Sequence, residues 1–68
     1  MSGLLKALEQ QYKAEIEKAK ANIDVYVRSS VGIGEHPDLV DAIATQMQKL
    51  SAAEDKLTTI RHFYGHEL

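Results

Sequence analysis

The sequence predicts an all-α fold, an antiparallel hairpin of two long helices. Two segments lack Gly and carry apolar residues every three or four positions, which is the spacing of one face of a helix. One segment of about nine residues, the only part of the chain with loop composition, separates them. Because so short a connection returns the chain beside itself, we expect the helices to lie antiparallel in one domain, residues 1–68.

The first helix is expected over about residues 4–27. This segment is rich in Ala, Leu, Lys, Glu and Gln, which favour helix. Charged residues fall on its other faces, and Glu9 and Lys13 stand in the favourable i,i+4 order. The apolar residues follow one another in steps of three or four: Leu5, Leu8, Tyr12, Ile16, Ala19, Ile23 and Tyr26 or Val27.

The connecting segment, residues 28–36, contains two glycines that alternate with two β-branched residues. Val31 and Ile33 are too apolar for a purely solvated linker, so we expect them to close the open end of the helix pair. Gly32 and Gly34 would then supply a positive φ or a close backbone approach.

The second helix is expected over about residues 37–64. Pro37 suits the first helical position, and Asp38 lies in the first turn, where negative charge opposes the macrodipole. Ser51 begins a Ser-x-x-Glu capping box, but the apolar pattern continues through it, so we expect an unbroken helix that ends before Gly65. The apolar residues are Val40, Ile43, Met47, Leu50, Ala53, Leu57, Ile60 and Tyr64.

The apolar residues of both segments exceed what one seam between two helices can cover. We expect the most buried positions to be Leu8, Ile16, Ile23, Ile43, Leu50 and Leu57. Further apolar residues lie beside this line: Leu4, Ala21, Val25, Leu39, Ala44 and Phe63. Wide apolar stripes need more than one neighbouring helix. A chain of 68 residues without cysteine also lacks the disulfides that stabilise other small domains. We therefore expect a homodimer, a four-helix bundle with coiled-coil packing.

Composition excludes several classes of protein. Eight basic and ten acidic residues give a net charge of −2, and the signs are interspersed, which disfavours direct binding of nucleic acid. The apolar runs fall far short of the roughly 20 residues that span a membrane. The N-terminal residues lack the apolar core of a signal peptide, so a cytoplasmic protein is expected.

Three patterns resemble chemical sites, and each has a plainer interpretation. Gly32-x-Gly34 before a helix suggests a phosphate loop, but no strand or Lys accompanies it, which favours a structural turn. His62 and His66 have the spacing of weak zinc ligands, but Gly65 lies between them, which favours frayed terminal histidines. Four aromatic residues could stack on single-stranded nucleic acid, but without a basic groove they more simply pack in the core or an interface: Tyr12, Tyr26, Phe63 and Tyr64.

The acidic and histidine side chains before the second helix form the remaining candidate site. His36 lies beside Glu35 and Asp38, as a general base with orienting carboxylates would, but no nucleophile accompanies it. We therefore expect no catalytic residue, no cofactor and no metal site, and thus no enzyme. Glu35 and His36 are instead expected to stay partly exposed and to face a partner.

The run Val31-Gly32-Ile33-Gly34-Glu35-His36-Pro37-Asp38, with Ala53-Glu54-Asp55-Lys56-Leu57, resembles a group of short uncharacterised proteins of tailed bacteriophages, T4-type and related. One such protein is encoded beside the recombination helicase of T4-type phages. The resemblance implies a helix–loop–helix fold, a viral or host-cytoplasm setting, and a phage helicase or recombination machinery as a larger partner. It implies no activity for any residue.

Taken together, these features predict a non-enzymatic interaction or accessory protein that acts by packing its helices against itself or a larger partner. The alternative is a small helical nucleic-acid-binding dimer.

Overall fold

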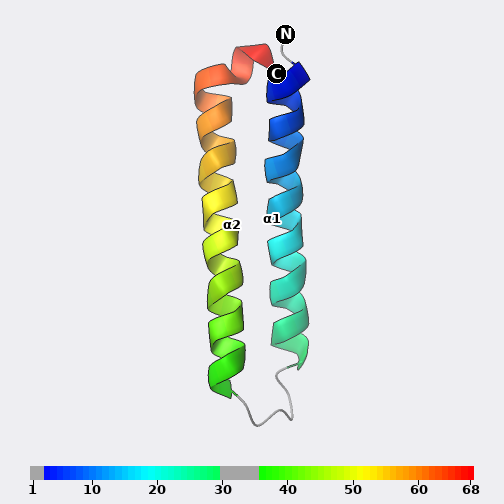
Figure 1. Cartoon of the computed structure of the whole chain (residues 1–68), viewed down its shortest axis with the longest axis vertical. Helices are drawn as coiled ribbons and strands as arrows, with labels where there is room; N and C mark the ends of the chain where they lie inside the picture. The colour runs from blue at the N-terminus through cyan, green and yellow to red at the C-terminus, as the bar shows by residue number, and fades with distance from the viewer. Residues whose placement is uncertain (1–2, 30–35) are drawn as a thin grey trace.

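The computed structural model describes residues 3–29 and 36–68, which form two long helices packed antiparallel. Helix α1 spans Gly3–Ser29 and helix α2 spans His36–Tyr64; a short 3-10 helix, η1, follows at Gly65–Glu67. The described start and end of the chain lie at the same end of the hairpin (Figure 1). The predicted all-α hairpin is confirmed. The expected closure of the helix pair by Val31 and Ile33 lies outside the described residues.

The ends and continuity of α2 agree with the sequence. The helix runs unbroken through Ser51, whose hydroxyl donates to the Gln48 carbonyl oxygen at 3.3 Å instead of capping a new helix. It ends at Tyr64, directly before Gly65, as predicted. The Leu68 N–H donates to the Gly65 carbonyl oxygen at 3.1 Å and closes the terminal 3-10 turn.

The hairpin is a rod with little interior. Its principal extents are 51 × 14 × 12 Å, and its radius of gyration is 15.5 Å. A compact domain of this length would have a radius of gyration of about 11 Å. Every apolar side chain of α1 and α2 that the structure describes therefore has at most one neighbouring helix to pack against.

Two alanines are the most buried residues of the seam between the helices. Ala19 and Ala53 are each 2% exposed, and the other buried apolar side chains in the two described helices are Leu57 and Ile60. The prediction of the core is right for Leu57. It is wrong for the other five positions, which are only half-buried: Leu8, Ile16, Ile23, Ile43 and Leu50. A single neighbouring helix covers a small side chain completely but leaves one side of a larger one open to solvent.

Two polar pairs cross the seam. Arg61 Nε donates to Glu9 Oε2 at 3.2 Å, and Asn22 Nδ2 donates to Gln46 Oε1 at 3.2 Å. Glu9 is 9% exposed, so the expectation that it pairs with Lys13 on a solvent face is wrong. Since a buried carboxylate needs donors, the Arg61 guanidinium stabilises it in this position. Within the described residues, no buried side-chain nitrogen or oxygen lacks a hydrogen bond.

The apolar stripe predicted for α2 is wrong in its first half. Val40 is 63% exposed and Met47 is 50% exposed, whereas Leu39 and Ala42 are half-buried. The hydrogen bond to Asn22 brings Gln46 to the seam, which turns its neighbour Met47 away from α1.

Candidate interaction face

The two polar pairs establish which residues of α1 and α2 lie level with one another along the rod. Glu9 is level with Arg61, and Asn22 is level with Gln46. Because the helices are antiparallel, each step forward along α1 is a step back along α2. Ile16 is therefore approximately level with Ala53, and Ile23 with Thr45.

One side of the seam is apolar over most of its length. We call this side the apolar face; its members are Ile16, Ile23, Ile43 and Leu50, all half-buried. The members on each helix are seven residues apart, which is close to two turns, so they share one side of their helix. Three exposed side chains extend this face at the end where α1 stops and α2 starts: Val27, Val40 and Met47.

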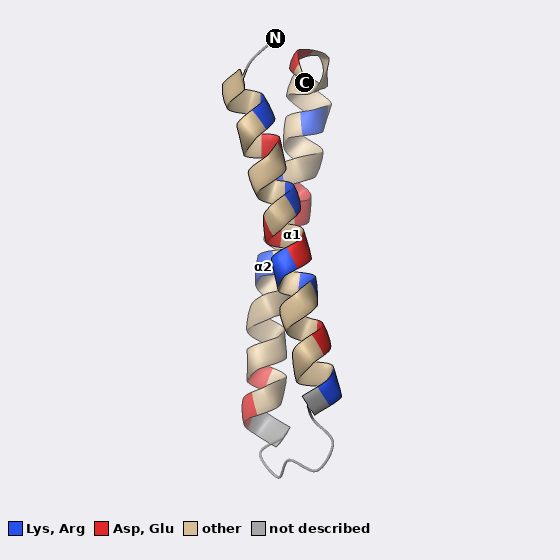
Figure 2. Ribbon diagram, turned by 90° about the vertical axis from the view of Figure 1, so that its right-hand side faces the viewer, with Lys and Arg blue, Asp and Glu red and all other residues tan. Residues whose placement is uncertain are grey.

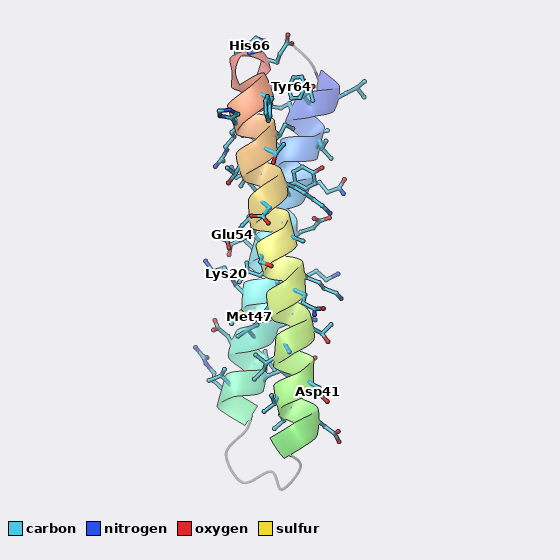
Figure 3. All side chains as sticks on the ribbon, turned by 90° about the vertical axis from the view of Figure 1, so that its left-hand side faces the viewer. Lys20, Asp41, Met47, Glu54, Tyr64 and His66 are labelled. Carbon is cyan, nitrogen blue, oxygen red and sulfur yellow. The ribbon has the colours of Figure 1, made fainter. Side chains whose placement is uncertain are left out.

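The opposite side of the seam, the polar face, is lined differently. It holds a shallow groove of about 350 Å³, whose apolar lining residues are Ala19, Ala52 and Ala53. The polar lining residues are Glu15, Lys18, Asn22, Gln46, Lys49 and Lys56. In Figure 3, Lys20, Met47 and Glu54 lie on one side of the hairpin and Asp41 on the other.

A second groove, of about 300 Å³, lies near the chain termini. Its apolar lining consists of Leu5, Leu8, Tyr12, Ile60 and Tyr64, and Asp55, Lys56 and Thr59 complete it. Leu4 and Phe63, in the neighbouring turns of the two helices, are exposed. We call these residues the terminal patch.

Charged residues of both signs are distributed along both helices (Figure 2). Lys20 lies 3.8 Å from Glu17, an exposed i,i+3 pair that contributes little to stability. Within the described part of the chain, Lys13 and Glu54 make no ion pair. Both are exposed, and both are available to a partner that approaches the apolar face.

The predicted partner-facing residues are not tested. Glu35 lies outside the described residues, and His36 is the first residue of α2 but its side chain is not described. Their role stays a prediction, as does the structural interpretation of Gly32 and Gly34, which also lie outside. Asp38 is exposed in the first turn of α2, as expected.

The terminal histidines do not share one helix face. His62 lies on α2 with its ring edge-on to Phe63, the centroids 4.6 Å apart at 87°. His66 lies in η1, off α2 as predicted, and its Nε2 is 3.7 Å from Glu67 Oε1. Over the described residues, no group of three His, Asp or Glu side chains is placed to hold a metal ion.

The aromatic residues divide into two pairs. Tyr12 and Tyr26 are half-buried on α1, in agreement with the expectation of packing. Phe63 and Tyr64 are exposed at the terminal end of α2, the first 62% and the second 50% exposed.

Sequence reasoning missed the difference between the two sides of the seam. A signal was present in the seven-residue spacing: Ile16 and Ile23 on one side of Ala19, and Glu15 and Asn22 on the other. The prediction counted apolar positions without dividing them between the sides.

Comparisons of the chain with protein-family models, with curated proteins and with solved structures find no match. The resemblance to short bacteriophage proteins therefore stays a prediction. Neither described helix combines the length and the hydropathy that crossing a membrane requires.

Proposed function

We propose that this chain is a non-enzymatic interaction protein, which acts by packing its apolar face against another protein chain, in the first place a second copy of itself. The observation that carries the proposal is the row of half-buried isoleucine and leucine side chains along one side of the seam. Fully burying such a side chain contributes roughly 1.5 to 3 kcal/mol, and the isolated hairpin obtains only part of this at each position.

The surface area of the hairpin supports the same proposal. Its accessible surface is 5062 Å². A compact monomer of 7.6 kDa is expected to expose about 4,300 Å². The excess is roughly 800 Å², which is the area that each partner buries in a protein–protein interface of standard size. A second copy packed along the rod would remove this excess.

Sedimentation velocity between about 1 and 200 μM tests the proposal, a range around the micromolar affinity expected for a modest interface. We expect the mass to rise from 7.6 kDa toward twice that value. Met47→Ser should weaken the association, because this half-exposed side chain extends the apolar face. Val25→Ser is the matched control: Val25 is 59% exposed and lies outside the apolar face. A mass of one chain at every concentration would contradict self-association.

The alternative, a nucleic-acid-binding helical dimer, has one supporting observation. Lys18, Lys49 and Lys56 line the groove of the polar face, where they could contact a phosphate backbone. Glu15 lines the same groove, and the net charge is −2, so we favour the protein partner. A gel shift with DNA and RNA at low salt should show no complex. A complex that Lys49→Glu abolishes would favour the alternative.

A larger protein partner would have two surfaces available. One is the apolar face; the other would consist of Glu35 and His36, which are candidates from the sequence alone. The bacteriophage resemblance points to a helicase or to recombination machinery as this partner. Capture from cells that express the wild-type chain, compared with a chain carrying Glu35→Ala and His36→Ala, separates this role from self-association.

A further inference from the structure

We infer that the second copy covers the apolar face with its own apolar face, and that both chains place their loop ends together. The loop end is the end of the hairpin at which α1 stops and α2 starts. The twofold axis of the dimer then runs along the helices. This inference rests on the proposed self-association and adds its orientation.

Two rows of residues border the apolar face, and each repeats every seven positions. The row on α1 is Lys6, Lys13, Lys20 and Val27; the row on α2 is Val40, Met47, Glu54 and Arg61. Residues seven apart lie close to two turns apart, about 10.5 Å along the helix. Each row is charged toward the terminal end and apolar toward the loop end.

With the loop ends together, α1 of each chain packs against α2 of the other at the same height. The register of the hairpin then puts Glu54 of the second copy between Lys13 and Lys20. It puts Val27 between Met47 and Val40 of the second copy. Glu54 thus meets two lysines of the other chain, and Val27 meets two apolar side chains, whereas Arg61 of the second copy lies between Lys6 and Lys13. Arg61 keeps its hydrogen bond to Glu9 within its own chain.

With the loop ends apart, α1 packs against α1 of the second copy and α2 packs against α2 of the second copy, each pair running in opposite directions. The row on α1 then brings Lys13 or Lys20 against another lysine or against Val27. The row on α2 brings Glu54 against another Glu54 or against Met47. The register that would bring Glu54 against Arg61 centres the dimer between these two residues and leaves the loop-end halves of both hairpins unpaired. Like charges across an interface are unfavourable, and so is a charge held against an apolar side chain. This arrangement is therefore the weaker one.

The terminal patch is a poorer site for the second copy. It occupies one end of a rod 51 Å long, and Asp55, Lys56 and Thr59 form part of its groove. The apolar face extends over several turns of both helices, and its central members are all Ile or Leu.

Charge reversal tests which helices meet. Lys20→Glu and Glu54→Lys should each raise the dimer dissociation constant about fivefold or more, since each puts like charges together. The double variant should return it to near the wild-type value, because it restores the opposite-charge contact between α1 and α2 of different chains. Lys49→Glu, on the polar face, is the control and should leave the dissociation constant unchanged. Failure of the double variant to recover would contradict the loop-ends-together arrangement.

Distances between spin labels test the orientation independently. The chain has no cysteine, so Ala7→Cys and Asp41→Cys, both exposed, each take a single label. With the loop ends together, the two labels at the same position of the two chains should lie about 30 Å apart for both sites. Helix spacings of 8 to 10 Å and the length of the labels set this distance. With the loop ends apart, at least one site should exceed about 40 Å, because it lies about ten residues or more from the centre of the dimer.

The outcomes of the labelling experiment separate the two proposals. Two short distances support the inferred orientation. A dimer with at least one long distance contradicts the orientation and leaves self-association standing. An absence of dipolar coupling, together with a monomer mass in sedimentation, contradicts both. A dimer that Phe63→Ser dissociates while Met47→Ser does not would move the interface to the terminal patch and overturn the inference.

Discussion

Replacing Ala53 by Leu should separate the two helices at the middle of the hairpin. Ala53 and Ala19 are each 2% exposed, so each methyl group already fills the space between the helices. A leucine at position 53 adds three carbon atoms at a position that α1 covers almost completely, with free space only in the shallow groove on the polar face. Overpacking of this kind typically costs about 1 to 3 kcal/mol. A chain of 68 residues is expected to have a free energy of unfolding of only about 3 to 10 kcal/mol, so the loss would be a large share.

Chemical denaturation followed by circular dichroism measures this loss, at one protein concentration for all variants because a dimer's stability depends on it. Ala44→Leu is the matched control. It makes the same change at an exposed position of α2, where surface substitutions usually change stability by less than about 0.5 kcal/mol. Equal midpoints for Ala53→Leu and Ala44→Leu would show that the helices do not meet closely at Ala53, and the account of the seam would be wrong.

Three further substitutions test the seam. Leu57→Ala should reduce the free energy of unfolding by roughly 2 to 5 kcal/mol, because Leu57 is a large apolar side chain buried at the seam. A loss below about 0.5 kcal/mol in urea titration would contradict its burial. Arg61→Ala should lower the free energy of unfolding by about 1 to 3 kcal/mol, because it leaves the Glu9 carboxylate without its donor. Glu9→Leu should lower it much less, since an apolar side chain needs no partner. A lower melting temperature for Glu9→Leu than for Arg61→Ala would refute this interpretation of the pair. Asn22→Ala should lower the free energy of unfolding by about 1 kcal/mol, because the hydrogen bond to Gln46 is lost. An unchanged melting temperature would show that this hydrogen bond contributes nothing to stability.

The helices themselves followed from local chemistry. Periodic apolar residues, Pro37 at the start of α2 and Gly65 after its end are signals that act within a few residues, and the observed bounds agree with them to within two residues. The continuity of α2 through Ser51 followed in the same way, because nothing near Ser51 interrupts the helical pattern.

The rotation of each helix about its axis did not follow from the sequence. Both apolar stripes are wider than one seam, so several rotations bury a similar number of apolar residues. Long-range pairs select among them: the bond between Asn22 and Gln46 turns Met47 outward, and Arg61 draws Glu9 inward. The residues of these pairs are 24 and 52 positions apart in the chain, beyond the reach of any local pattern.

The candidate interaction face was partly predictable. Ile16, Ile23, Ile43 and Leu50 were correctly recognised as an apolar set, but they were assigned to the centre of the hairpin. Their half-buried state in the hairpin agrees with the expectation that two helices cannot cover these stripes. The other candidates, Glu35 and His36, rest on local sequence alone, and the described residues do not test them.

The central claim is that another copy of the chain covers the apolar face. Methyl NMR with a soluble paramagnetic agent tests it directly, because the agent broadens only methyl signals that solvent reaches. Ile60, which is 5% exposed, is the internal reference for a fully covered methyl group. At concentrations at which the dimer is formed, we expect Ile16, Ile23 and Ile43 to be protected as well as Ile60, and to lose this protection on dilution or in the Met47→Ser variant. Strong broadening of these three signals at every concentration, with Ile60 protected throughout, would show that the apolar face stays open to water and would contradict the account.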